Sequence, residues 1–168
     1  SSIPYIPYQY YGKKSIVSSG ITTSTFRLQQ PTNTTSKKYS KVGIGTTSKF
    51  GSGSAYFDGN NYLRYSDPRN SSYVFGTGDF SIEFWVNPST LSGTQVLYDG
   101  RPGTTGPYPY VYTSGTTLYY NANNSNEITG ILTTGSWQHV LIQRESASTL
   151  MFVDGVEQGT YPDTTFYR

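Results

Sequence analysis

The sequence contains no cysteine and only one histidine, His139. Without cysteine the protein has no disulfides, no thiolate nucleophile, no iron–sulfur cluster and no cysteine-ligated zinc. The lone histidine also leaves no histidine pair to bind a metal ion. These absences further argue against a small secreted scaffold that is held together by disulfides.

Helix-forming residues and long apolar runs are also scarce. The 168 residues include 3 alanines, against 23 threonines, 22 serines, 18 glycines and 9 prolines. No apolar run approaches the roughly 18 residues that a membrane helix needs, so we expect no membrane span. Threonine and tyrosine fit a pleated, half-buried surface, whereas glycine, proline and serine supply turns. The composition therefore predicts an all-β fold.

Aromatic residues make up for a modest content of other core residues. Leu, Ile, Val and Phe together make up about a fifth of the chain, a level at which disorder becomes a concern. The sequence nevertheless has 17 tyrosines, 8 phenylalanines and 2 tryptophans, and each such ring buries a large area. We therefore expect a folded core.

Charge is distributed unevenly along the chain. Residues 1–50 contain six lysines, one arginine and no carboxylate, whereas residues 51–168 contain five arginines and all ten carboxylates. The formal net charge of +2 thus combines +7 in the first part with −5 in the second. Such asymmetry indicates an arm joined to a body. The lysines either solubilise an exposed segment or dock onto an acidic neighbour, and no nucleic-acid-binding module is recognisable.

The predicted arm spans residues 1–48. Its first eleven residues repeat an Ile-Pro-Tyr unit, and prolines at that spacing block helix and favour extended chain. The best strand candidate in the arm is 25–28. If the arm docks onto a partner, we expect the contacts to come from its tyrosines and lysines: Tyr5, Tyr8, Lys13, Lys14, Lys37, Lys38 and Lys41.

The predicted body spans residues 49–168 and consists of short strands separated by turns. The clearest segment is 80–87, where Phe80, Ile82, Phe84 and Val86 alternate with polar residues and are expected to face a core. Trp85 on the other face implies partial cover there. The remaining strand candidates are 55–57, 62–65, 95–98, 108–112, 116–120, 137–144 and 149–153. Many short strands with turns every 8–15 residues are typical of a sandwich.

The residues give little support to an enzyme. A retaining glycosidase needs two carboxyl groups about 5–5.5 Å apart, and none of the ten carboxylates has another two positions along the chain. Carboxylates from different strands could still meet. A Ser-His-Asp hydrolase would depend on His139, which alternates with Trp137 and Leu141 and reads as a packed or hydrogen-bonded sheet residue, and no Gly-x-Ser-x-Gly elbow is present. We predict that the protein is not an enzyme.

We predict no cofactor. Calcium is an alternative without support, because Asp58, Asp99 and Asp154 each precede a glycine in a sequence that is ordinary turn chemistry. No twelve-residue calcium loop is present.

Four motifs in order carry a resemblance: Phe50-Gly-Ser-Gly-Ser-Ala-Tyr-Phe-Asp-Gly59, Phe75-Gly-Thr-Gly-Asp-Phe-Ser-Ile-Glu-Phe-Trp-Val86, Gly135-Ser-Trp-Gln-His-Val140 and Phe152-Val-Asp-Gly155. Over about residues 49–160 the chain resembles the laminin-G-like, concanavalin A-like lectin/glucanase superfamily. It is most similar to modules of phage tail, fibre and capsid-appendage proteins and of bacterial surface proteins. The resemblance implies a two-sheet antiparallel jelly-roll sandwich that often binds sugar or protein through loops at one rim, sometimes with calcium.

Two departures from the family pattern shape the prediction. The family's domain usually continues beyond the Val-Asp-Gly hairpin, so we expect the closing strands to be absent here and an open sheet edge to be covered by more chain or by another subunit. The clustered Glu-x-Asp-x-x-Glu of the glucanase branch is also missing. No calcium or sugar ligand carries over from the family to a residue of this chain.

The leading hypothesis is a non-enzymatic structural or adhesion module of a virion appendage or cell-surface assembly, with a lectin-like surface. It implies other structural subunits as partners, a homo-oligomer or larger assembly, and a location on a virion or outside the cell. The alternative is a carbohydrate-binding lectin module of a bacterial surface protein, and the third is a glycoside hydrolase of the glucanase branch. A glycan would stack on exposed aromatics among Tyr108, Tyr110, Tyr112, Tyr119 and Tyr120, although tyrosine-rich strands more often serve as sheet cover.

Overall fold

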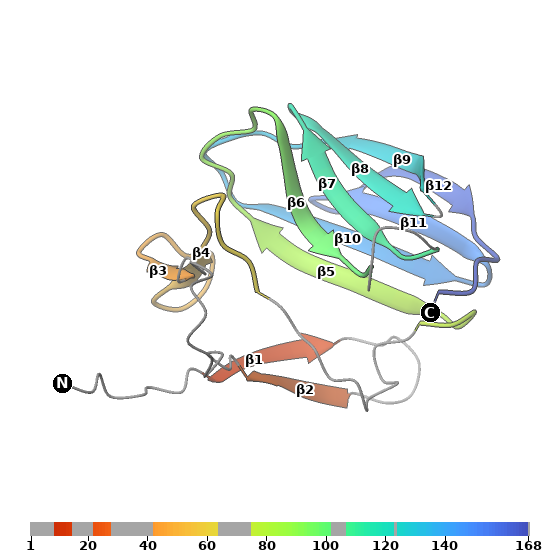
Figure 1. The fold of residues 1–168 in the computed structure, drawn as a ribbon, viewed down its shortest axis with the longest axis horizontal. Coiled ribbons are helices and arrows are strands. Elements are labelled where there is room, and N and C mark those ends of the chain that lie inside the picture. Colours follow the sequence, from red (N-terminus) through yellow and green to blue (C-terminus); the bar gives the residue numbers. More distant parts are fainter. Residues whose placement is uncertain are drawn as a thin grey trace, which may run out of the picture. The chain divides into compact units, whose positions relative to one another are not determined.

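A computed structural model describes residues 9–14, 22–27, 42–63, 75–101, 107–122 and 124–167, with side chains described from residue 42 onward. Every regular element in these ranges is a β-strand (Figure 1). The chain divides into two compact units, Ser1–Arg69 and Asn70–Arg168. In the described residues there is no helix of the length and apolar character needed to cross a membrane.

The first unit contains two small antiparallel sheets. Strand β1 (Gln9–Lys14) pairs with β2 (Thr22–Arg27), and β3 (Gly43–Gly45) pairs with β4 (Ser54–Tyr56). The boundary predicted between residues 48 and 49 lies within the first unit, between the paired strands β3 and β4, and the division into an arm and a body stays a prediction. The strand predicted at 25–28 overlaps β2. Of the strand predicted at 62–65, the first two residues are not in a strand and the rest lie outside the described residues.

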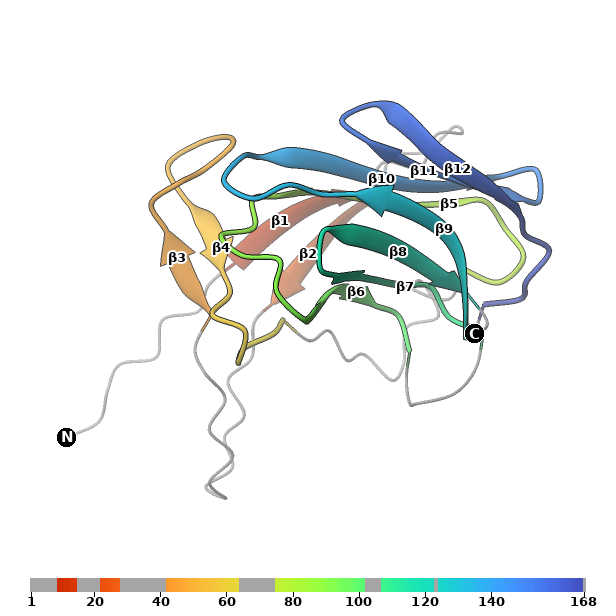
Figure 2. The same ribbon diagram turned by 90° about the horizontal axis from the view of Figure 1, so that it is seen from above.

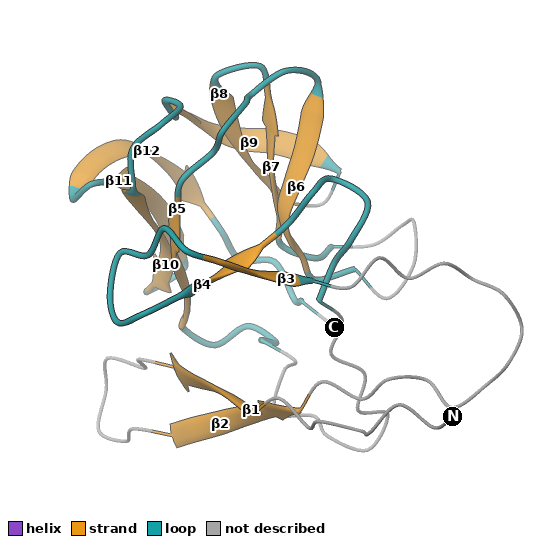
Figure 3. Ribbon diagram, turned by 90° about the vertical axis from the view of Figure 1, so that its left-hand side faces the viewer, coloured by secondary structure: helices purple, strands orange, loops and turns teal. Residues whose placement is uncertain are grey.

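The second unit consists of two four-stranded antiparallel sheets, which confirms the predicted fold class. One sheet has the order β12-β11-β10-β5 and the other β6-β7-β8-β9; Figure 2 shows them as two layers. The first sheet contains β5 (Phe80–Val86), β10 (Gln138–Glu145), β11 (Ser148–Val153) and β12 (Val156–Pro162). The second contains β6 (Thr94–Asp99), β7 (Tyr110–Ser114), β8 (Thr117–Ala122) and β9 (Ser125–Ile131). Figure 3 shows the same strands from the side.

Tight turns connect the hairpins. Asp154 and Gly155 both have positive φ, 50° and 78°, and join β11 to β12. Two successive residues with positive φ make a type I′ turn, whose twist matches that of the flanking strands. The Asp-Gly sequence is suited to this conformation because asparagine, aspartate and glycine tolerate it at low cost.

Alternating residues of both sheets form one core. In β5, Phe80 and Ile82 are buried, and Phe84 and Val86 pack against the core, which confirms the predicted apolar face. The opposite sheet contributes Leu118 and other residues at every second position. Burial of such side chains contributes about 1.5–3 kcal/mol each. The remaining buried apolar residues include Val111, Tyr120, Ile128, Leu132, Val140, Ile142 and Met151.

In the second unit two strands, β9 and β12, were not predicted, because each is polar and contains a glycine; in the first unit β1 and β3 were not predicted. Gly159 faces the opposite sheet, where a Cβ atom added to it would lie 3.0 Å from Cγ2 of Ile128. Gly130 is equally confined, with an added Cβ 3.1 Å from Cε of Met151. The glycines that weaken the strand pattern in the sequence therefore permit the two sheets to approach closely.

The last described residues pack into the second unit. Tyr167 is fully buried, and its backbone N–H and C=O both bond to Gly76 at 2.9 and 2.8 Å. Among the described residues β5 pairs only with β10, so its other side is a sheet edge there. The expectation that the family's closing strands are absent here, and that more chain or another subunit covers an open edge, stays a prediction.

Candidate functional site

The tyrosines predicted to contact a ligand fall into two groups. Tyr110 and Tyr112 lie on β7, and Tyr119 lies on β8. All three are half-buried and occupy the outer face of the sheet, because their neighbours Val111 and Leu118 point into the core. Tyr108 and Tyr120 are buried, and Tyr120 has no exposed surface. Those two residues therefore leave the predicted set, since a surface ligand cannot reach them.

The three outer tyrosines form a stack. The ring centroids of Tyr110 and Tyr112 are 5.0 Å apart, and those of Tyr112 and Tyr119 are 4.9 Å apart, with interplanar angles of 27° and 14°. The cross-strand register explains the second contact, because Tyr112 and Tyr119 are direct partners in the β7–β8 pair. Such offset stacking contributes about 0.5–1.5 kcal/mol per pair beyond area burial. We call these three residues, with Arg101, Asn121 and Asn126, the tyrosine face.

Arg101 covers one end of the stack. Its guanidinium carbon lies 3.8 Å from the centroid of the Tyr110 ring. The same guanidinium donates two hydrogen bonds to Asp99, from Nε at 2.8 Å and from Nη2 at 2.7 Å. These bonds raise the pKa of Arg101. Burial alone would raise the pKa of Asp99, but the hydrogen bonds from Arg101 outweigh it and lower that pKa.

The stack determines which aromatic surface a ligand could use. The Arg101 guanidinium covers one side of the Tyr110 ring and leaves no room there for a second ring. The Tyr112 ring, which stacks on Tyr110, therefore covers the other side. Tyr110 thus has no face left for stacking. Tyr119 has Tyr112 as its one ring partner in the described part of the chain, and its neighbour on β9 is the exposed Thr129. The accessible aromatic surface therefore lies at the Tyr119 end.

Hydrogen-bonding groups flank the middle ring of the stack, Tyr112, because Asn121 and Asn126 lie in the cross-strand row of Tyr110. Oδ1 of Asn126 accepts bonds from the Tyr112 hydroxyl at 3.0 Å and from Nδ2 of Asn121 at 2.9 Å. These bonds fix the orientation of the exposed Asn126 amide, whose nitrogen has no partner among the described residues. Two amide groups beside a ring edge can donate to and accept from a hydroxyl-rich ligand.

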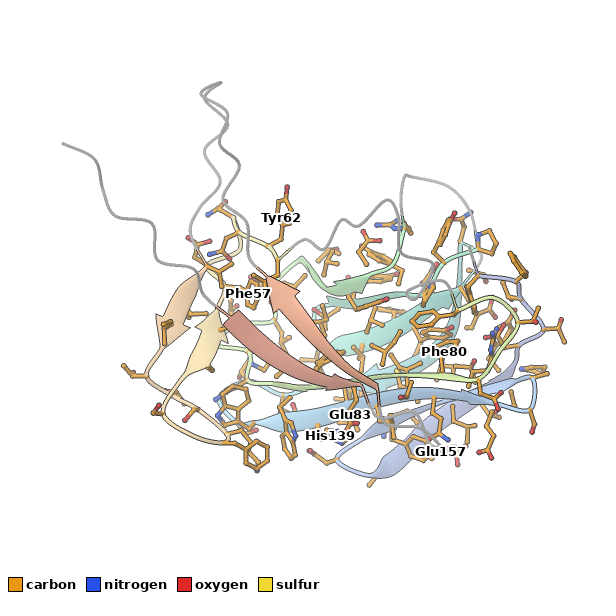
Figure 4. All side chains as sticks on the ribbon, turned by 90° about the horizontal axis from the view of Figure 1, so that it is seen from below. Phe57, Tyr62, Phe80, Glu83, His139 and Glu157 are labelled. Atoms are coloured by element: carbon orange, nitrogen blue, oxygen red, sulfur yellow. The ribbon has the colours of Figure 1, made fainter. Side chains whose placement is uncertain are left out.

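His139 lies on the outer face of the other sheet. Its Nε2 is 2.8 Å from Oε1 of Glu83, its backbone N–H donates to Oδ1 of Asp154 at 2.8 Å, and its ring lies 5.0 Å from that of Trp85. The prediction of a packed, hydrogen-bonded sheet histidine is confirmed. Figure 4 labels His139 and Glu83.

A buried polar cluster was not predicted. Arg144 is 1% exposed and donates to the carbonyls of Gly76, Gly78 and Thr165. Asp163 is also buried: its Oδ2 accepts bonds from Thr149 at 2.7 Å and Tyr167 at 2.8 Å. We call Arg144, Asp163, Thr149, Tyr167 and Tyr120 the buried cluster. One signal was available, because Arg144 continues the inward-facing alternation of Val140 and Ile142.

Hydrogen bonds and burial set the pKa values in this cluster. Burial alone would raise the pKa of Asp163, but the bonds from Thr149, Tyr167 and Thr165 hold it below its ordinary value. Burial raises the pKa of Tyr167 and of Tyr120, whose hydroxyls are 2.8 Å apart. Of these three groups the carboxylate is therefore the charged one, and both tyrosines are neutral donors.

The aspartates of the three Asp-Gly turns each have a local partner. Oδ1 of Asp58 accepts a bond from the backbone of Asn60, Asp99 binds Arg101, and Asp154 binds the backbone of His139. No group of three or more potential metal ligands occurs in the described ranges.

The predicted docking arm is described only in part. Lys13 and Lys14 belong to β1. Tyr5, Tyr8, Lys37, Lys38 and Lys41 lie outside the described residues. The role of these residues stays a prediction.

Comparison with known proteins agrees with the architecture. A family model for the concanavalin A-like lectin/glucanases superfamily matches residues 57–167, which include the tyrosine face and the buried cluster. The comparison with curated proteins found no match, and neither did the comparison with solved structures. The predicted similarity to phage modules stays a prediction. Since the matched range covers more than half of the chain, the protein belongs to the concanavalin A-like lectin/glucanases superfamily.

Proposed function

We propose that the protein is a non-enzymatic adhesion module that binds a carbohydrate through its tyrosine face. The observation that carries this proposal is the three-ring stack, which has its accessible aromatic surface at Tyr119 and holds Asn126 and Asn121 beside its middle ring, Tyr112. Sugars present apolar C–H faces beside hydroxyl groups, and a ring next to amides complements both. The stacking and the hydrogen bonds also order this surface before binding, which lowers the entropic cost of association.

A binding role without catalysis is supported by the partners of the carboxylates. Asp99 pairs with Arg101, Glu83 with His139, and Asp163 is buried beside Tyr167. A retaining glycosidase requires two carboxyl groups free to act on either side of one sugar bond. The third hypothesis, a glycoside hydrolase, is therefore the least favoured.

The setting of the module is also part of the proposal. The ordered sequence motifs resemble modules of phage tail, fibre and capsid-appendage proteins and of bacterial surface proteins. We accordingly place the protein in a virion appendage or a cell-surface assembly, in contact with other structural subunits. In such an assembly many copies would bind together, so weak sites could give strong overall adhesion.

The test is a glycan array followed by calorimetric titration of the strongest glycan. We expect Tyr119→Ala to weaken binding about tenfold, or about 1.4 kcal/mol, and Tyr56→Ala, an exposed tyrosine of β4, to leave it unchanged. An array with no bound glycan, or equal binding by Tyr119→Ala, would contradict the proposal. Release of new reducing ends from a bound glycan would contradict the non-enzymatic part.

A further inference from the structure

The outer surface of the sheet β12-β11-β10-β5 combines carboxylates with half-buried apolar side chains. One cross-strand row reads Glu83, Leu141, Phe152, Glu157, with each residue the direct partner of the next. The carboxylates are exposed, and the two apolar residues between them are partly exposed. We call this surface, with Leu150 of the next outward-facing row and Glu145 of the row beyond it, the acidic face. Figure 4 labels two of its residues, Glu83 and Glu157.

No lysine or arginine compensates these charges on the described part of the sheet. Its strands contain one arginine and no lysine, and that arginine, Arg144, points into the core. His139 is the other titratable group on this surface and is hydrogen-bonded to Glu83. A sheet face that carries uncompensated carboxylates around apolar side chains favours a partner that is both basic and apolar.

The first unit of the same chain has that chemistry. Residues 1–69 contain nine Lys and Arg against two aspartates, a net charge of +7, whereas residues 70–168 contain three arginines against eight carboxylates, a net charge of −5. The β1–β2 sequences combine Lys13, Lys14 and Arg27 with Tyr10, Tyr11 and Phe26. A two-stranded sheet is marginally stable alone, so this pair needs a surface to pack against.

We propose that the acidic face binds the β1–β2 strand pair of a second copy of the chain. A chain with a basic unit and an acidic face is complementary to its own copies in a head-to-tail arrangement, which builds a ring or a filament. The attraction is between exposed charges and is screened by salt. The interface is on the sheet opposite the tyrosine face, so it is independent of glycan binding.

Sedimentation velocity of the full chain tests this interface. We expect concentration-dependent association at low ionic strength that weakens about tenfold at an ionic strength of about 0.5 M. Glu145→Lys with Glu157→Lys should abolish it, and so should Lys13→Glu with Lys14→Glu. Glu127→Lys on β9 of the other sheet is the control and should associate like the wild type. Circular dichroism of each variant checks that it is folded.

Mixing gives the decisive result. In an equimolar mixture of the two charge-reversed proteins, the face that now carries lysines can bind the strand pair that now carries glutamates. The unchanged face of one protein can likewise bind the unchanged strand pair of the other, so we expect association to return. A wild-type chain that sediments as a monomer at every concentration would overturn the proposal. That result would also be obtained if the β1–β2 pair docked onto the acidic face of its own chain. Association that survives both charge reversals, or fails to return on mixing, would overturn it as well.

Discussion

The buried cluster and the tyrosine face, taken with Asp99 beside it, share three residue types and differ in burial. Each has one arginine, one aspartate and tyrosines: Arg144, Asp163, Tyr120 and Tyr167 inside, and Arg101, Asp99, Tyr110, Tyr112 and Tyr119 outside. Inside, the arginine donates mainly to backbone carbonyls and lies 3.7 Å from the carboxylate. Outside, it forms a two-bond pair with its aspartate.

This difference shows what burial does to the same chemistry. A buried charge must have its hydrogen bonds satisfied, and loss of one partner leaves the others unpaired at high cost. An exposed pair exchanges its partners with water and contributes little. We therefore assign the buried cluster to stability and the tyrosine face to binding, and the following predictions test that division.

The largest effect is expected from Arg144→Met. The change leaves the carbonyls of Gly76, Gly78 and Thr165 without their donor and Asp163 without its nearby cation. The free energy of unfolding in urea should fall by about 3–5 kcal/mol. The matched change Arg101→Met should cost about 1 kcal/mol or less, because that pair is exposed. Equal losses of unfolding free energy in Arg144→Met and Arg101→Met would contradict the division between the buried cluster and the tyrosine face.

A smaller effect is expected from Tyr167→Phe. The change removes the hydroxyl that donates to Asp163 and contacts the Tyr120 hydroxyl, and leaves the ring against Phe80 in place. Loss of this buried bond should reduce the unfolding free energy by about 1–3 kcal/mol. Tyr112→Phe removes an exposed hydroxyl bond to Asn126 and should change stability by about 0.5 kcal/mol or less. Thermal denaturation of the two variants, Tyr167→Phe and Tyr112→Phe, measures this difference in stability.

Acid should destabilise the protein partly through Asp163. Because the pKa of this carboxyl is lower in the folded than in the unfolded state, its contribution is present above the ordinary value of 3.8 and is lost as the pH falls through the folded pKa. Unfolding free energies measured between about pH 7 and pH 3 should decline toward acid. The decline should be shallower in Asp163→Asn, and an identical slope would count against this assignment.

Alkali should also destabilise the protein, through the two buried tyrosines. Burial raises the pKa of Tyr120 and Tyr167 in the folded state, so their contribution is present below the ordinary value of 10.0 and is lost as the pH rises above it. Absorbance of tyrosinate during a pH titration should show these two ionising only as the protein unfolds. Ionisation of every tyrosine near the ordinary value before unfolding would contradict the buried cluster.

Much of the fold could be predicted from the sequence, because alternation and turn chemistry are local. Phe80, Ile82 and the Asp154-Gly155 turn carry such signals. The strands that contain Gly130 and Gly159 could not be recognised, since those glycines serve contacts with the opposite sheet. Residues far apart in sequence also set the pairing of Gly76 with Tyr167.

The candidate site was predictable only as a group of tyrosines. Strand periodicity places Tyr110 and Tyr112 on one face, but the 108–112 candidate could not show that Tyr108 precedes β7 and is buried. The cover of Tyr110 by Arg101 depends on a contact between residues nine positions apart in the sequence. Sequence therefore indicated the residue type, and the structure identified Tyr119 as the accessible end.

The most direct test is to measure glycan affinity and unfolding free energy on the same two variants, Tyr119→Ala and Tyr167→Phe. We predict that Tyr119→Ala weakens binding about tenfold with a stability change of about 1 kcal/mol or less. Tyr167→Phe should lower stability and leave the affinity of the folded protein unchanged. Loss of affinity in Tyr167→Phe, with none in Tyr119→Ala, would contradict the assignment of the two regions.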